Sequence, residues 1–90
     1  MTILYEIKTT ETFNKQLKSL TKNEQRAVYN KLNIMVQNPY HPSLRTKKYK
    51  GTIDLFEMSV NKDIRILWRY EGNKIILMLE VGHHKNVLGV

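Results

Sequence analysis

The apolar residues of this chain change their spacing several times, and each spacing predicts a different element. Residues Ile3–Lys8 alternate apolar and polar side chains, which is typical of a half-buried strand. Two patterns of helical spacing follow, with apolar side chains on one face: Phe13, Leu17 and Leu20 in the first, and Val28, Leu32, Met35 and Val36 in the second. The very short connection between them predicts a hairpin of two helices.

The ends of the second helix carry their own signals. Thr21 and Glu24 are spaced as a capping box, in which each side chain accepts a hydrogen bond from the backbone N–H of the other residue. Asn38 precedes Pro39, and a residue before proline is disfavoured in the α conformation. The helix is therefore expected to begin just after Thr21 and to end at Asn38.

The second half of the chain is rich in strand-forming residues. After a loop predicted over Tyr40–Gly51, three β-rich runs are separated by short turn sequences at 61–63 and 71–73; the runs are Leu55–Val60, Ile64–Tyr70 and Ile75–Val81. The order β-α-α-β-β-β indicates an α+β protein. We expect a single domain over residues 1–90, with two N-terminal helices packed on one face of a twisted antiparallel sheet.

Strand alternation sorts the polar side chains of this sheet. If the most apolar faces cover the helices, one open face collects Glu57, Ser59, Arg65, Arg69, Glu80 and His84, together with Leu67 and Met78. One interpretation is a solvated face with cross-strand Glu–Arg pairs. The other is an anion site, where arginines hold a phosphate close to groups that transfer protons. By the same alternation His83 is expected on the core side, packed and hydrogen-bonded.

Alternation alone favours the first interpretation, but the overall charge of the chain points to the kind of partner it binds. Fifteen Lys and Arg against eight Asp and Glu give a net charge of +7 and a pI of about 9.8. Such a balance favours a polyanionic partner such as nucleic acid. With no cysteine and three histidines, disulfides are excluded and no metal or cofactor is expected. Neither a signal sequence nor a membrane-spanning run is evident, so a cytoplasmic protein without membrane contact is expected.

The order of motifs resembles a known family. The segment DLFEMSVNKDIRILWRYEGNKIILMLEVGHHKNVL is similar to the C-terminal half of RelE/ParE superfamily toxins, and the helical half and the His-Pro-Ser-Leu loop fit as well. The resemblance implies the toxin half of a type II toxin–antitoxin pair, with a cognate antitoxin whose acidic segment covers the basic face. RelE-like members cleave mRNA on the ribosome, whereas ParE-like members inhibit DNA gyrase. A catalytically degenerate toxin that binds only antitoxin and nucleic acid is a further alternative.

The resemblance assigns roles to individual residues. Arg65 matches an arginine that contacts the scissile phosphate, and His84 lies where YafQ-like toxins have a catalytic histidine. Asp63 and His41 match acidic and histidine positions of that branch. RelE itself has a lysine pair where this chain has Glu57 and Ser59, so that lysine-based chemistry is absent. Leu88 replaces an aromatic residue that stacks on a base, which moves the stacking role to Tyr49 or Trp68.

Cleavage of this kind is an attack of a 2′-hydroxyl on the adjacent phosphate and needs a base, an acid and cations. His84 is the preferred acid, because imidazole titrates near neutral pH. Asp63, His41 and Glu57 are the candidate bases in that order, although Asp63 also suits a hairpin turn for backbone reasons. Arg65 holds the phosphate, and a second group is expected to contact the RNA backbone: Arg69, Arg45, Lys47, Lys48, Lys50 and Tyr49.

Overall fold

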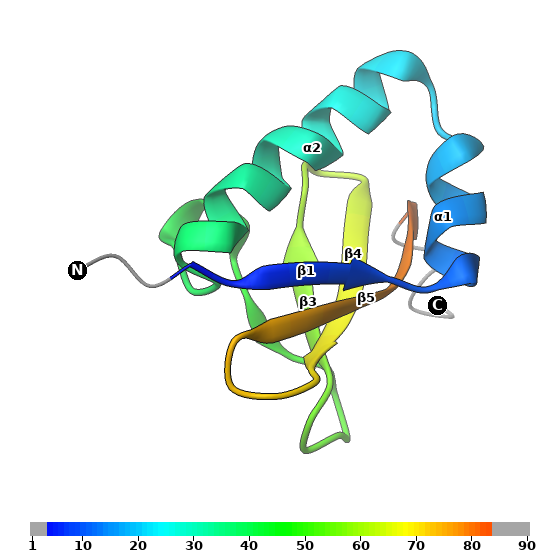
Figure 1. The fold of residues 1–90 in the computed structure, drawn as a ribbon. Coiled ribbons are helices and arrows are strands. Elements are labelled where there is room, and N and C mark those ends of the chain that lie inside the picture. Colours follow the sequence, from blue (N-terminus) through cyan, green and yellow to red (C-terminus); the bar gives the residue numbers. More distant parts are fainter. Residues whose placement is uncertain (1–3, 84–90) are drawn as a thin grey trace.

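The computed structural model describes residues 4–83, and its elements follow the predicted order (Figure 1). Two helices come after the first strand, and the remaining strands follow them. The elements are β1 (Glu6–Thr9), α1 (Glu11–Lys18), α2 (Lys22–Gln37), the 3-10 helix η1 (Pro42–Leu44), β2 (Lys47–Lys48), β3 (Phe56–Ser59), β4 (Ile64–Tyr70) and β5 (Ile75–His83).

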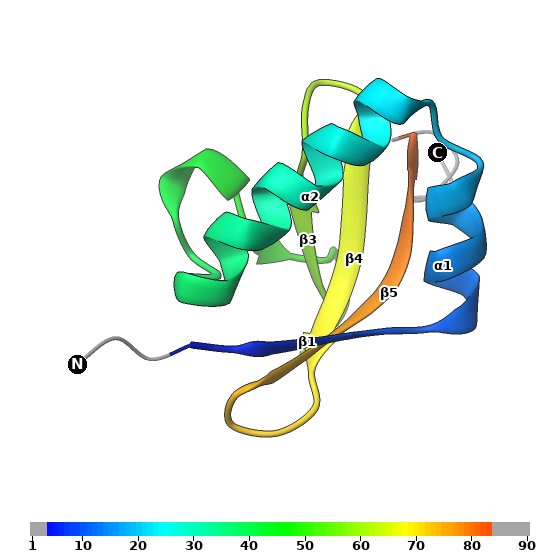
Figure 2. The ribbon, with the colours of Figure 1, turned by 45° about the horizontal axis from the view of Figure 1, so that its top comes forward.

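The strands form one open sheet in the order β1-β5-β4-β3-β2, and the helices lie on one of its faces (Figure 2). The α+β class, the helix pair and the two predicted hairpins are confirmed. One detail differs. The sheet is mixed rather than antiparallel throughout, because β1 pairs in parallel with β5. The segment predicted as a loop also contains the short elements η1 and β2.

The core lies between the sheet and the helices. Trp68 is fully buried and stacks on Phe56, with ring centroids 4.6 Å apart and an interplanar angle of 19°. Tyr70 packs edge-on against both rings, and its burial raises the pKa of its hydroxyl, as does its hydrogen bond with Tyr40. The helices contribute the fully buried side chains Phe13, Val28 and Met35.

A bulge in the β4–β5 pairing corrects the predicted sheet faces. Leu67 pairs with Glu80, but Trp68 pairs with Met78, so Leu79 is an extra residue on β5. Alternation reverses at this residue. Met78, expected on the open face, is fully buried in the core together with Ile76, and that prediction was wrong.

The part of β5 that extends beyond β1 is closed by α1. The hydroxyl of Thr10 donates to the backbone oxygen of Leu79 at 2.9 Å. Farther along, the backbone N–H of Val81 donates to Oε1 of Gln16 at 2.8 Å. Thr10 also caps α1 by accepting from the N–H of Phe13. These bonds satisfy backbone groups at a sheet edge that no strand pairs.

The predicted capping box at the start of α2 is confirmed. The N–H of Thr21 donates to Oε1 of Glu24 at 2.9 Å, and the N–H of Glu24 donates to Oγ1 of Thr21 at 3.1 Å. His83 lies on the helix side of the sheet, with Nε2 3.1 Å from the other carboxylate oxygen of Glu24. It is hydrogen-bonded as expected, but its side chain is half exposed.

This arrangement predicts a contribution of Glu24 to acid unfolding. The hydrogen bond from the Thr21 N–H, and then the contact with His83, lower the pKa of Glu24 below its ordinary value of 4.5. The stabilising effect of the carboxylate is therefore complete above pH 4.5 and is lost as the pH falls through the lowered folded-state pKa. We expect the melting temperature of the protein to fall more steeply in acid than that of Glu24→Gln, which keeps the capping box without the charge. If the melting temperatures of the two proteins fall in parallel between about pH 6 and pH 3, this expectation is contradicted.

Candidate functional site

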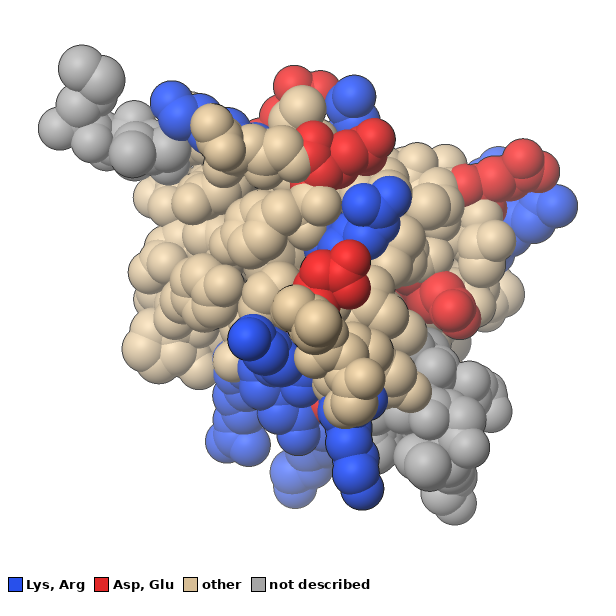
Figure 3. All heavy atoms as spheres, turned by 90° about the horizontal axis from the view of Figure 1, so that it is seen from below, with Lys and Arg blue, Asp and Glu red and all other residues tan. Residues whose placement is uncertain are grey.

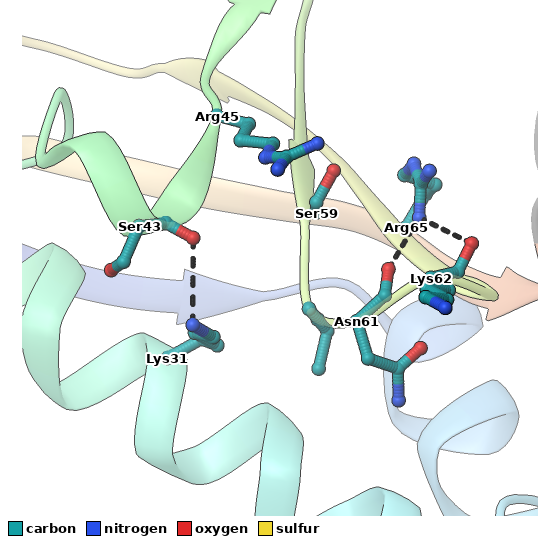
Figure 4. Close-up of a pocket in the computed structure, with 8 residues that line it drawn as sticks. Lys31, Ser43, Arg45, Ser59, Asn61, Lys62 and Arg65 are labelled. Atoms are coloured by element: carbon teal, nitrogen blue, oxygen red, sulfur yellow. Dashed lines mark hydrogen bonds between the residues drawn. The ribbon is translucent and has the colours of Figure 1, made fainter.

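Four positively charged side chains surround one cavity at the end of the sheet where β3 turns into β4 (Figure 4). They come from four segments: Lys31 from α2, Arg45 from the residue after η1, Lys62 from the β3–β4 turn and Arg65 from β4. The cavity has a volume of about 380 Å³, and none of its lining residues is acidic. We call it the basic pocket; its other lining residues are Ser43, Ser59, Val60 and Asn61.

The β3–β4 turn fixes the position of Arg65. Oδ1 of Asn61 accepts from the backbone N–H groups of Asp63 and Ile64, both at 2.8 Å, which closes the turn. Nη1 of Arg65 donates to the backbone oxygens of Asn61 and Lys62 at 2.6 and 3.1 Å. No hydrogen bond joins Nε or Nη2 of Arg65 to another residue in the described part of the chain. These donors are therefore available to an anion.

The opposite wall of the pocket is built around η1. Leu44 is fully buried and anchors this helical turn to the core. Nζ of Lys31 donates to the backbone oxygen of Ser43 at 3.4 Å, which ties α2 to η1. The turn ends at Arg45, whose backbone is left-handed with φ 50°, an uncommon conformation for a residue with a side chain. Figure 4 shows the Arg45 guanidinium extending across the pocket toward Ser59.

The charge of the pocket suits an anion with several oxygen atoms. Arginine presents a planar fork that binds phosphate or carboxylate through two parallel hydrogen bonds, and lysine adds a point charge. The hydroxyl groups of Ser43 and Ser59 offer further donors. Figure 3 shows a group of Lys and Arg side chains projecting together from one side of the molecule, with most carboxylates of that view elsewhere. An anion bound here relieves repulsion between the cations that surround it.

Several predicted residues do share the open sheet face. Arg65 pairs across the strands with Ser59, and Glu57 lies two residues before Ser59 on the same face. Glu57 is buried, with 6% of the residue exposed, and its carboxylate forms an ion pair with Lys47, with Nζ of Lys47 3.4 Å from Oε1. Glu57 does not line the basic pocket. As a candidate base it is already engaged by a lysine.

His41 is not brought together with Arg65. It lines a second cavity with residues of α2. Its Nδ1 accepts from the backbone N–H of Ser43 at 3.1 Å and so caps the helical turn. His41 therefore does not line the basic pocket, and its role as a general base stays a prediction. The lone pair on Nδ1, which a general base would use to take a proton, already accepts from the backbone N–H of Ser43.

The remaining candidates have separate positions. Asp63 is exposed in the β3–β4 turn and does not line the basic pocket, although its neighbours Lys62 and Arg65 do. Trp68 is fully buried, so a stacking role for this residue is wrong. His84 and Leu88 lie outside the described residues, and the role predicted for His84 stays a prediction.

The residues predicted to contact the RNA backbone lie in different parts of the structure. Among them, only Arg45 lines the basic pocket. Lys47 and Lys48 form β2, and the backbone N–H of Tyr49 donates to the oxygen of Leu55 at 2.8 Å. The other members predicted to contact RNA, Lys50 and Arg69, do not line the pocket either.

Sequence reasoning missed two of the four cations. Lys31 lies next to Leu32 at the border of the apolar face of α2, and Lys62 was assigned only to a turn. No local pattern distinguishes these lysines from other solvated ones.

No described helix is long and apolar enough to cross a lipid bilayer. Within residues 4–83, no group of three or more His, Cys, Asp or Glu side chains is arranged to hold a metal ion.

Comparison with known proteins places the fold. No family model matches the chain, and no curated protein matches it significantly in sequence. Solved structures do match. The Escherichia coli DinJ–YafQ toxin–antitoxin complex has a TM-score of 0.78 at 14% identity, over 97% of this chain and 100% of that one. An archaeal RelE–RelB complex from Pyrococcus horikoshii has a TM-score of 0.70 at 22% identity, over 89% and 94%.

A third match is a YoeB/ParE toxin from Agrobacterium tumefaciens, with a TM-score of 0.76 at 10% identity over 88% of this chain and 98% of that one. The three share nearly their whole length with this chain while differing in most residues. What they have in common with it is the arrangement of two helices on a sheet. The chain therefore has the fold of the RelE/ParE superfamily of toxins, as its motifs predicted.

Proposed function

We propose that this protein is the toxin of a type II toxin–antitoxin pair and that it cleaves mRNA in the cytoplasm, on the ribosome. The observation that carries the proposal is the basic pocket, where four cations and no acid meet at the edge of the open sheet face. The fold supports it, because solved structures with this fold include toxins in complex with their antitoxins. A phosphate of the RNA backbone is the ligand that this charge and these donors suit.

The chemistry proposed for the site is attack of a 2′-hydroxyl on its neighbouring phosphorus. The 5′-oxygen leaves with a proton, and a cyclic phosphate remains on the other fragment. Arg65 and Arg45 hold the phosphate oxygens and stabilise the charge that develops on them. His84 supplies the proton to the leaving oxygen, and Asp63, which lies beside the pocket in the turn, takes the proton of the attacking hydroxyl. Every step is a proton transfer or a bond exchange at phosphorus, so neither metal nor cofactor is required.

The proposed protein partner is an antitoxin with an acidic segment. The net charge of +7 favours association with an acidic chain, and complementary charge raises the rate of encounter. A carboxylate of that segment fits the basic pocket for the same reasons as a phosphate does. Neutralisation of the toxin then follows from occupation of the basic pocket by the antitoxin's acidic segment.

The function is tested by inducing the gene and mapping the 5′ ends of a reporter mRNA by primer extension. We expect growth arrest and new 5′ ends within translated codons, because the proposed target is mRNA on the ribosome. Arg45→Ala should remove most of both effects, whereas Lys74→Ala, at the opposite end of the sheet, should remove neither.

The outcome also separates the alternatives. Growth arrest with intact mRNA and an SOS response would indicate a gyrase inhibitor. Unaffected growth and unaffected mRNA would indicate a degenerate toxin. Either result would overturn the proposed cleavage.

A further inference from the structure

A second cavity lies beside η1, and its chemistry differs from that of the basic pocket. It has a volume of about 390 Å³ and carries no formal charge among its lining residues when His41 is neutral. The C-terminal turns of α2 supply most of the wall, and His41 supplies the rest. The lining residues are Asn33, Ile34, Gln37, Asn38 and His41.

The hydrogen bonds of His41 fix which ring nitrogen faces a ligand. Nδ1 accepts from the backbone N–H of Ser43 at 3.1 Å and lies 2.9 Å from the Ser43 hydroxyl. A nitrogen that accepts from a backbone N–H carries no hydrogen, so in the neutral ring the hydrogen is on Nε2. His41 therefore offers a donor and a flat ring surface.

The amide groups of α2 complete a set of donors and acceptors. Asn33 and Gln37 are one helical turn apart and exposed on the same side of α2. Among the described residues, neither carboxamide has a hydrogen-bond partner. Asn38 differs, because its Oδ1 accepts from the N–H of Tyr40 at 3.0 Å. Two free carboxamides beside a flat ring and the apolar Ile34 side chain suit a planar ligand with polar edges.

A nucleobase has these properties. Asn and Gln pair with the edge of adenine through two hydrogen bonds, and histidine rings stack on unpaired bases in RNA-binding proteins. A phosphate does not suit this cavity, since no cation lines it when His41 is neutral.

The two cavities are linked through neighbouring residues of η1 and its cap. Ser43 lines the basic pocket, and the same residue is hydrogen-bonded to His41 in the second cavity. Lys31, in the basic pocket, is on α2 two residues before Asn33. We propose that the second cavity holds an unstacked nucleobase, adenine best, of the strand whose phosphate lies in the basic pocket. The inference rests on the proposed function and adds a site of base selection to it.

The test is fluorescence anisotropy with two labelled probes of equal charge. One is an oligodeoxyadenylate of about eight nucleotides and the other an abasic deoxyribose-phosphate of the same length; neither has the 2′-hydroxyl needed for cleavage. We expect the protein to bind the adenylate about tenfold more tightly, the usual gain from stacking and pairing of a base. The double variant Asn33→Ala/Gln37→Ala should lose most of this ratio and keep its affinity for the abasic probe.

Two further variants make the result specific. His41→Asn keeps a side-chain acceptor for the Ser43 N–H but removes the ring, and should also lower the ratio. Asn30→Ala, at an exposed position of α2 outside both cavities, should leave the ratio unchanged. All substitutions are at exposed positions, and circular dichroism will confirm that the variants are folded.

A ratio that is unchanged in Asn33→Ala/Gln37→Ala would overturn the base site. So would equal binding of both probes by the unmodified protein, which would leave phosphate binding intact. If the protein binds neither probe, the base site is overturned, whereas the proposed function is decided separately by the mapping of mRNA 5′ ends.

Discussion

Arg65→Ala is expected to lower the rate of RNA cleavage by about 100-fold or more, the loss typical of removing a donor that stabilises a developing oxyanion. Arg65 is held in place by the adjacent turn, through its Nη1 bonds to the oxygens of Asn61 and Lys62. A pre-positioned fork loses little conformational freedom when it binds phosphate. The measurement is single-turnover cleavage of a reporter mRNA by purified protein added to a translating extract.

Two variants serve as controls for Arg65→Ala. Arg65→Lys keeps the charge without the fork and should retain part of the activity, because a lysine cannot make two parallel bonds to the phosphate. Arg26→Ala removes an exposed arginine of α2 that does not line the basic pocket, and should cleave normally. Cleavage by folded Arg65→Ala at the rate of Arg26→Ala would remove Arg65 from the mechanism.

Trp68→Ala is expected to destabilise the fold by about 3–5 kcal/mol, as large-to-small changes of buried aromatic residues do. Trp68 is fully buried on the middle strand of the sheet and stacks on Phe56, and Tyr70 packs against both. Domains of this size are stable by only about 5–15 kcal/mol, so the variant should be close to unfolded at physiological temperature. Urea denaturation followed by circular dichroism measures this, because the substitution removes the only tryptophan of the chain.

Trp68→Phe should be much milder. The smaller ring keeps the stack with Phe56, and Nε1 of Trp68 is buried without a hydrogen-bond partner among the described residues. Removing an unsatisfied buried N–H recovers part of its desolvation cost, about 1–3 kcal/mol, which offsets the lost contacts. Equal destabilisation by Phe and Ala would show that the stack contributes little.

The sequence by itself determined the local structure. Thr21, Glu24 and Pro39 set the ends of α2 because capping and the restriction before proline act within a few residues. The turn residues placed both hairpins, and alternation put Arg65 and Glu57 on one face of the sheet. Charge and motif order together indicated an anion-binding surface and the correct fold.

The tertiary structure alone decided how these elements meet. The extra residue Leu79 reverses the alternation of β5, because strand pairing and not local spacing determines where a bulge forms. The parallel pairing of β1 with β5 brings together segments that are almost seventy residues apart.

The candidate site depends on the same long-range packing. Lys31 reaches the basic pocket only because α2 crosses the sheet beside η1, and His41 caps that helical turn and lines a different cavity from Arg65. Spacing along the chain carries no information about these contacts. They arise where separate elements pack against each other, and the three-dimensional arrangement of those elements selects which of many similar lysines and histidines face the same ligand.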